Sequence, residues 1–237
     1  MGRVRRVYLA LLKHADVVCV QGSKSEEKLL ALNVQREKIT ILKNSLDTSR
    51  FKPDPKTQKI YDLIYVGRLD SLKRVEVLLH TLHLLLPTHP HISLAIVGIG
   101  KETEKLRKLA HILKIEENVH FFGYQKRVEK FLQKSRIFLF PSVNESLPFA
   151  VVEALSCGVP VIAARVGDVE DVVKNGENGL LLDEVSPEAF CKAIKTILDK
   201  EKLYNNLAKK AQEIANLYSP KKARESWKNV LIRFKNT

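Results

Sequence analysis

The sequence has few of the residues that characterise disulfide-rich and membrane-spanning proteins. Its 237 residues include three cysteines, one methionine and one tryptophan. Because Cys19, Cys157 and Cys191 are odd in number and lack metal-ligand spacing, we expect buried, reduced thiols in a cytoplasmic protein. The apolar runs are short, so we expect no transmembrane helix. No apolar segment of a signal peptide follows the N-terminal arginines, which argues against secretion.

Acidic residues are also in the minority. The chain has 27 acidic and 40 basic residues, and its net charge of +13 calls for a partner such as nucleic acid, anionic lipid headgroups or nucleotide phosphates. The basic residues are dispersed over 101–114, 126–136 and 200–224 with no aromatic ribbon among them, so we expect no nucleic-acid partner. Peripheral contact with the cytosolic face of a membrane is the better alternative. We interpret most of these residues as a solvated exterior.

Short apolar runs alternate with helical patterns along almost the whole chain. The expected strands are 17–20, 39–42, 62–66, 92–97, 119–122, 137–140, 160–164 and 179–182. The expected helices are 3–14, 23–32, 73–86, 101–113, 127–134, 148–157, 169–174 and the tail, 201–237. Continuous apolar strands separated by helices predict an α/β fold with a doubly wound, Rossmann-like parallel sheet. Ser23 and Glu26 predict a capping box at the start of the second helix.

A proline-rich link at 51–55 predicts a domain boundary. Segment 1–53 has only two strands and two helices, so we interpret it as the end of a second, N-terminal Rossmann-like domain plus the linker. We interpret 54–217 as a complete domain and 218–237 as a C-terminal helix that is expected to pack on the N-terminal domain. Ser219 and Pro220 predict the start of that helix. The apolar face expected on it comprises Ala223, Trp227, Val230, Leu231 and Phe234. The basic, amphipathic helix at 3–14 either lies on a membrane or packs on the rest of its domain, and we give packing twice the weight.

One stretch carries two carboxylates in almost uncharged sequence. Residues 144–160 read N-E-S-L-P-F-A-V-V-E-A-L-S-C-G-V-P. Glu145 precedes Pro148, which suits the first turn of a helix, and Glu153 falls about a turn and a half inside that helix. A carboxylate on so apolar a helix is costly to bury without a partner. Amides at the start of the helix suit a phosphate and the carboxylates suit sugar hydroxyls, so the stretch favours a phosphorylated, polyhydroxylated ligand.

Three further motifs follow expected strands, where ligands of open α/β sheets bind. Arg68 and Lys73, in Y-V-G-R-L-D-S-L-K, are placed to clamp a diphosphate. Gly98, in I-V-G-I-G-K, lacks the third glycine of a dinucleotide fingerprint, so we expect a tight turn there that lets a ligand approach the backbone. Asp168 either faces the ligand or caps the helix that follows it, and we give capping at least equal weight.

Other catalytic constellations are weaker. His80 and His83 lie three residues apart without a third ligand, so we expect no metal site. The serines near 142–156 lack a nucleophile elbow. Paired glutamates also suggest a glycosidase, but one of them is expected inside a helix, which makes hydrolysis the lesser interpretation.

Taken together, these residues resemble the retaining nucleotide-sugar glycosyltransferases of family 4, the group 1 glycosyltransferases with the GT-B fold. The likeness runs from about residue 15 to residue 234. It rests on A-D-V-V-C-V-Q-G-S, K-I-T-I-L-K-N-S-L-D-T-S-R-F-K-P, V-G-R-L-D-S-L-K and V-H-F-F-G-Y. The most specific match is E-S-L-P-F-A-V-V-E-A-L-S-C-G-V-P-V-I-A, which is similar to the family's E-x7-E motif.

The resemblance implies a site for a nucleotide-diphosphate sugar, the donor, in segment 54–217, with no metal or other cofactor. Arg68 and Lys73 would hold the diphosphate and stabilise the leaving group, Glu145 would contact the sugar hydroxyls, and Glu153 would contact the ribose. The implied catalytic residues are Glu145, Arg68 and Lys73. The implied donor-binding residues are Gly67, Arg68, Lys73, Gly98, Tyr124, Glu145, Ser146, Leu147, Pro148, Phe149 and Glu153. Tyr124, Gln125 and Lys126 are expected to border the base.

The resemblance also implies partners and leaves one alternative. A glycan, lipid or small-molecule acceptor would receive the sugar with retention of configuration, commonly by front-side attack. Relatives carry the acceptor site on a whole N-terminal domain, of which 1–53 is only the end, so a separate N-terminal half or a membrane surface is a possible partner. The alternative is a truncated, non-catalytic module that binds a nucleotide sugar or a partner chain. A nucleic-acid-binding protein is the third hypothesis.

Overall fold

The computed structural model describes residues 11, 12 and 14–235, with side chains described as far as residue 232. Its centre is a six-stranded parallel sheet in the order β5-β4-β3-β6-β7-β8. The strands are β3 (Tyr61–Val66), β4 (Leu94–Val97), β5 (Val119–Gly123), β6 (Ser135–Phe140), β7 (Val161–Ala164) and β8 (Gly179–Leu182). All four residues of β4 and of β7 are buried, as the continuous apolar runs predicted. The prediction of a doubly wound parallel sheet is confirmed.

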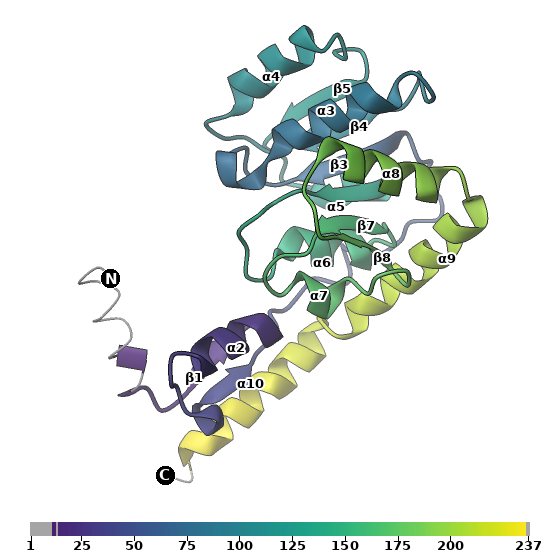
Figure 1. Ribbon diagram of the computed structural model, residues 1–237. Coiled ribbons are helices and arrows are strands. Elements are labelled where there is room, and N and C mark those ends of the chain that lie inside the picture. The colour runs from purple at the N-terminus through teal and green to yellow at the C-terminus, as the bar shows by residue number, and fades with distance from the viewer. Residues whose placement is uncertain (1–10, 13, 236–237) are drawn as a thin grey trace.

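Helices cover both faces of this sheet (Figure 1). One face packs against α3 (Val75–Leu85), α4 (Thr103–Ile112) and α8 (Pro187–Leu198). The other face packs against α5 (Val128–Gln133), α6 (Phe149–Ser156) and α7 (Val169–Val172). The helix α9 (Glu201–Ala211) and the short 3-10 helix η3 (Gln212–Asn216) follow α8. The result is a three-layer sandwich with an apolar core on each side of the sheet.

A smaller unit precedes this sandwich. Strands β1 (Val18–Val20) and β2 (Ile39–Ile41) form a parallel two-stranded sheet, with α2 (Ser23–Leu30) and the 3-10 turn η1 (Arg36–Lys38) between them. We call β1, α2 and β2 the amino-terminal unit. It lies in the lower part of Figure 1 with α10 (Pro220–Lys235), away from the six-stranded sheet. Most of the helix expected at 3–14 lies outside the described residues.

The C-terminal helix begins at Pro220, as Ser219 and Pro220 predicted. Only part of its expected apolar face is covered: Ala223 and Val230 are buried, whereas Trp227 is 50% and Leu231 57% exposed. The side chain of Phe234 lies outside the described residues.

Two sequence-based predictions about the fold were wrong, and one helix was missed. The expected capping box does not form, because the Ser23 side chain donates to Asp171 and the cap position of α2 is Gly22. Cys19 is exposed on β1, in contrast to buried Cys157 and half-buried Cys191. The helix α8 was not predicted, although Ser186 accepts a hydrogen bond from the amide of Ala189 and Pro187 follows it. This is the same Ser-Pro signal that correctly located α10.

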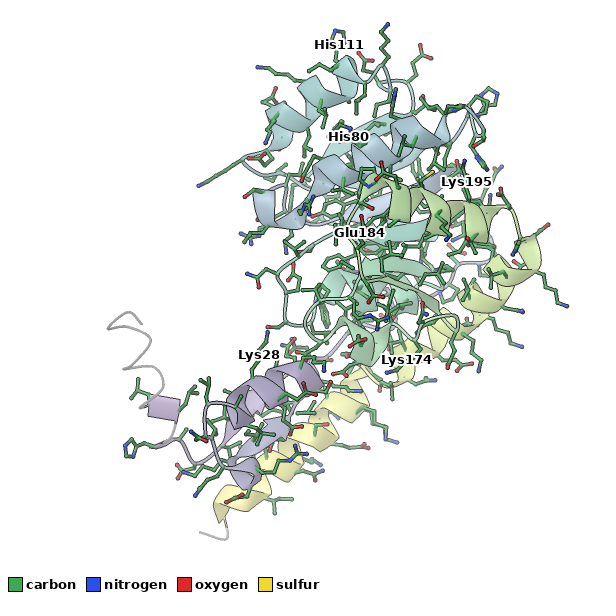
Figure 2. All side chains as sticks on the ribbon, in the orientation of Figure 1. Lys28, His80, His111, Lys174, Glu184 and Lys195 are labelled. Carbon is green, nitrogen blue, oxygen red and sulfur yellow. The ribbon has the colours of Figure 1, made fainter. Side chains whose placement is uncertain are left out.

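The labelled lysines do not gather in one place, and no candidate membrane span is found among the described residues. In Figure 2 the labelled Lys28, Lys174 and Lys195 lie on α2, just after α7 and on α8, in separate parts of the molecule. None of the helices within the described residues combines the length and the apolar composition needed to cross a bilayer.

Candidate functional site

The candidate site lies where the strand order of the six-stranded sheet reverses. Strand β3 pairs with β4 on one side and with β6 on the other, and Leu63 is in register with Leu94 and with Ile137. The connections that leave β3 and β6 therefore run to opposite sides of the sheet, and ligands of open α/β sheets bind where they diverge. We call the region between the turn after β3 and the loop after β6 the crevice. The turn after β3 carries Gly67, Arg68 and Lys73, and the loop after β6 carries 141–148. The proximity of these two segments could not be predicted from their spacing in the sequence alone.

An ion pair joins the two segments at this crevice. The Lys73 ammonium contacts Glu145 Oε1, and both side chains are 16% exposed. The Ser142 hydroxyl donates to the same oxygen at 3.0 Å. The Leu72 carbonyl accepts from the Ser142 hydroxyl at 3.2 Å and from the Val143 amide at 3.3 Å, so the loops are also tied through the backbone. Two predicted site residues thus meet directly, and Ser142 is a third member that the sequence did not indicate.

Arg68 lies at the surface beside this pair. Its side chain is 78% exposed and its Nη2 lies 3.3 Å from Asp70 Oδ2. The Arg68 carbonyl accepts a hydrogen bond from the Tyr65 hydroxyl at 2.8 Å, and burial strongly raises the pKa of that hydroxyl. A neutral, buried tyrosine therefore fixes the backbone of the turn, while the guanidinium remains accessible to an anion.

Beside Arg68 is a pocket of about 270 Å³ at the ends of β3, β4 and β5. Its lining includes Gly67, Arg68, Gly98, Tyr124 and Gln125. Gly98 has φ +145°, and a Cβ there would lie 1.8 Å from the Gly67 carbonyl oxygen. The tight turn expected at Gly98 is therefore present, and it brings two backbone segments together in the wall of the pocket.

The remaining residues of the E-x7-E stretch form the entry to α6. Pro148 is the residue before the helix and not its first residue, with φ −73° and ψ 116°. Leu147 is buried and Phe149 packs partly against the core, so these side chains fix the helix start. Ser146 is exposed, and its carbonyl accepts from the Asp168 amide at 2.8 Å. The first turn of α6, with its free amide groups, begins at Phe149, four residues after Glu145.

Glu153 lies inside α6 in an apolar and acidic environment. Burial raises the pKa of its carboxyl group to about 7; the positive charge of Arg50 opposes this shift, and the negative charge of Glu129 adds to it. Glu129 is itself buried and accepts from Arg50 Nη2 at 2.8 Å and from Arg127 Nε at 2.9 Å. Sequence reasoning missed Arg50 and Glu129, since no spacing rule connects the linker after β2 with the start of α5.

The raised pKa of Glu153 predicts a distinct pH dependence of stability. The folded carboxyl group titrates near 7 and an unperturbed one near 4.5, so between these values the folded chain binds more protons than the unfolded chain. The free energy of unfolding therefore falls as the pH rises through this window. In Glu153→Gln the side chain at this position does not ionise. Between pH 4.5 and 7 the free energy of unfolding of this variant should therefore fall by up to about 3 kcal/mol less than that of the wild type. Urea unfolding of both proteins at several pH values measures the difference, and parallel profiles would contradict the assignment.

The structure assigns different places to the other candidates. Asp168 neither faces the crevice nor caps α7; its side chain accepts from the backbone amide and the hydroxyl of Ser25 on α2. His80 is exposed, and His83 Nδ1 lies 3.1 Å from the Leu113 carbonyl oxygen. Within the described residues, no cluster of three or more His, Cys, Asp or Glu side chains is arranged to hold a metal ion. That the reaction needs no metal stays a prediction.

Comparison with known proteins identifies the family. The model of the "Glycosyl transferases group 1" family matches residues 47–214, which include every candidate residue of the crevice. The chain belongs to the group 1 glycosyltransferases. An uncharacterised glycosyltransferase of Haemophilus influenzae is 32% identical, over 71% of this chain and 48% of the relative. The D-inositol 3-phosphate glycosyltransferase of Corynebacterium glutamicum is 27% identical, over 88% of this chain and 55% of the relative.

Solved structures of other proteins share the fold. The Anabaena protein HepE, crystallised with UDP, matches with a TM-score of 0.86 at 20% identity, over 98% of this chain and 67% of that one. Sucrose-phosphate synthase from Thermosynechococcus elongatus matches with a TM-score of 0.89 at 22% identity, over 100% of this chain and 63% of that one. The GT-B architecture expected from the resemblance is thus confirmed. The chain spans about half the length of the curated relatives it matches.

Proposed function

We propose that this group 1 glycosyltransferase chain binds a nucleoside-diphosphate sugar in the crevice between β3 and β6. The observation that carries the proposal is the ion pair of Lys73 and Glu145, which lies at the point where the strand order reverses. A lysine and a glutamate side by side supply a cation for phosphate and an acceptor for sugar hydroxyls. The pair is neutral as a whole, so the site keeps both groups largely out of water without an uncompensated charge.

Each remaining residue has a proposed role along the donor. Lys73 exchanges Glu145 for a phosphate oxygen, and exposed Arg68 reaches the diphosphate from the other side. Glu145, released from Lys73, accepts hydrogen bonds from the sugar hydroxyls. Glu153 contacts the ribose. Tyr124 and Gln125 border the base. Both residues line the pocket beside Gly98, which supports this placement of the base.

We further propose that the protein transfers a hexose to a glycan, lipid or small-molecule acceptor with retention of configuration. The two cations would stabilise the negative charge that develops on the leaving diphosphate, the main electrostatic requirement of this reaction. Front-side attack, with a donor phosphate oxygen taking the acceptor proton, would account for retention. Two relatives suggest the acceptor class by name: the inositol phosphate enzyme of Corynebacterium glutamicum and a phosphatidylinositol N-acetylglucosaminyltransferase subunit of Homo sapiens.

Acceptor binding requires residues beyond the crevice. We propose that the amino-terminal unit, with α10, belongs to a second domain that presents the acceptor, with a boundary near residue 53. The half-exposed Trp227 and Leu231 on α10 support this division, because they form an apolar surface that the described residues leave open. A location on the cytosolic side of a membrane fits a lipid acceptor and a basic chain.

Calorimetric titration with UDP, GDP, ADP and their glucose conjugates tests the donor site. At least one nucleoside diphosphate should bind, and Arg68→Ala should weaken that binding about tenfold through the loss of one charge-assisted contact. Glu153→Ala should weaken binding of the nucleotides but not of inorganic diphosphate, because its proposed partner is the ribose. Lys108→Ala, at an exposed position on α4, is the matched control and should bind like the wild type.

The outcomes separate the competing hypotheses. If the folded wild type binds none of these compounds, the donor site is wrong. If it binds a donor but neither hydrolyses it nor transfers its sugar, the chain is a binding module. Binding to random duplex DNA at moderate salt would favour the nucleic-acid hypothesis instead.

A further inference from the structure

Hydrogen bonds join the start of α2 in the amino-terminal unit to two carboxylates of the other domain: Asp168, which immediately precedes α7, and Asp171, which lies within it. Ser25 donates its backbone amide to Asp168 Oδ1 at 2.9 Å and its hydroxyl to Asp168 Oδ2. Ser23 donates its amide and its hydroxyl to Asp171 at 2.6 and 2.7 Å. Carboxylates at the start of a helix are stabilised by the free amide groups and by the helix dipole. We call these four hydrogen bonds the α2 junction.

The α2 junction is closely packed at Gly22, so it is sensitive to any increase in side-chain volume at this position. A Cβ at Gly22 would lie 2.4 Å from Asp168 Cβ and 2.4 Å from Asp171 Oδ2. Contacts this short are not tolerated, so any side chain at this position must displace the Asp168 and Asp171 side chains that accept from α2. Asp168 is fully buried, which means that a displaced carboxylate would lose its donors without ready access to water.

The same aspartate is also tied to the loop that carries Glu145. The Asp168 amide donates to the Ser146 carbonyl at 2.8 Å. Gly167 has φ +53°, and a Cβ there would lie 2.0 Å from the Glu145 carbonyl oxygen. Residues 167 and 168 therefore touch the backbone of the Glu145 loop on one side and hold α2 on the other. A single buried residue connects the crevice with the amino-terminal unit.

We propose that Asp168 is a positioning residue that couples the Glu145 loop to α2, so that donor binding and the α2 junction stabilise each other. The proposal rests on the proposed donor site, since Glu145 must change its partner when a diphosphate takes Lys73. The backbone of the Glu145 loop is hydrogen-bonded to Asp168, and Asp168 is hydrogen-bonded to Ser25 of α2. The position of α2 therefore affects the free energy required to move Glu145. By linkage, a junction that strengthens donor affinity must itself be strengthened by the donor to the same extent.

The test measures donor affinity and α2 protection together in the full chain. Titrations with UDP, GDP and ADP use the wild type, Ser25→Ala, Gly22→Ala, Asp168→Ala and Asp168→Asn. Hydrogen exchange of the α2 peptide is followed with and without the nucleotide. Ser25 and Gly22 lie on the amino-terminal unit, outside the proposed donor contacts, so a local defect at the crevice cannot explain a loss of affinity in these two variants. Ser226→Ala, on α10, is the matched serine control, and thermal melts exclude unfolded variants.

Ser25→Ala, Gly22→Ala and Asp168→Ala should each weaken nucleotide binding at least about fivefold, the lower end of typical coupling between sites. Asp168→Asn should recover part of the affinity, because its Oδ1 still accepts from the Ser25 amide. The nucleotide should slow exchange in α2 of the wild type but not of Asp168→Ala. If the wild type binds a nucleotide while Ser25→Ala binds equally well and α2 exchange does not respond, the coupling is wrong although the donor site stands. If the wild type binds no nucleotide, both fail.

Discussion

Lys73→Ala should weaken binding of nucleoside diphosphates about a hundredfold, equivalent to about 2.7 kcal/mol. The ammonium is held largely out of water, at 16% exposure, where its attraction to a phosphate is screened less than at the surface. Its removal also leaves Glu145 without its counter-ion, so a carboxylate would face the incoming diphosphate. Both effects act in the same direction, which is why the loss should exceed that of exposed Arg68.

Glu145→Gln is the matched variant for this prediction. It removes the carboxylate that competes with phosphate for Lys73 and keeps the size of the side chain, so affinity for the nucleoside diphosphate should be unchanged or higher. The affinity for the nucleoside-diphosphate sugar should fall relative to the affinity for the nucleoside diphosphate. The reason is that an amide oxygen accepts hydrogen bonds from sugar hydroxyls less strongly than a carboxylate does. Calorimetry of both variants with UDP, GDP, ADP and their glucose conjugates gives the ratio. Equal losses for sugar and diphosphate in Glu145→Gln would refute the proposed division of roles.

Gly98→Ala should destabilise the folded chain by at least about 3 kcal/mol, the upper end of the cost of a strained backbone. Its φ of +145° lies in a region that side-chain-bearing residues rarely adopt, and the new Cβ would meet the Gly67 carbonyl oxygen at 1.8 Å. Relief requires the ends of β3 and β4 to separate, which would also deform the pocket beside Arg68. Urea unfolding measures the loss of stability, and nucleotide titration below the unfolding transition measures the damage to the pocket.

Gly176→Ala is the control that separates the two causes of the loss expected for Gly98→Ala: backbone strain at a positive φ, and the steric clash of the new Cβ with the Gly67 carbonyl oxygen. Gly176 also has a positive φ, +79°, but a Cβ there meets nothing within 4 Å. Its substitution should cost only about 1 kcal/mol and leave nucleotide binding intact. Similar losses for the two variants would mean that the close approach of Gly98 to Gly67 contributes little.

Local sequence patterns were sufficient for most of the fold. The runs that became β4 and β7 are apolar throughout, because strands buried on both faces cannot carry an exposed polar side. Ser219 and Pro220 located the start of α10, since a cap and a fixed φ are local properties. The helix α8 was not predicted although Ser186 and Pro187 carry the same signal, so the information for it was present in the local sequence.

The candidate site could be predicted only in part. The sequence by itself indicated the candidate residues, because Arg68 and Lys73 lie in one motif and Glu145 and Glu153 in another, and the residue types and spacing of each motif can be read locally. Only the tertiary structure decided their partners: Lys73 pairs with Glu145 across the strand reversal, and Asp168 binds Ser25 instead of capping α7. It also placed Arg50 and Glu129 near Glu153. The physical reason is that burial, pairing and pKa depend on segments far apart in the chain, which meet only when the sheet is assembled.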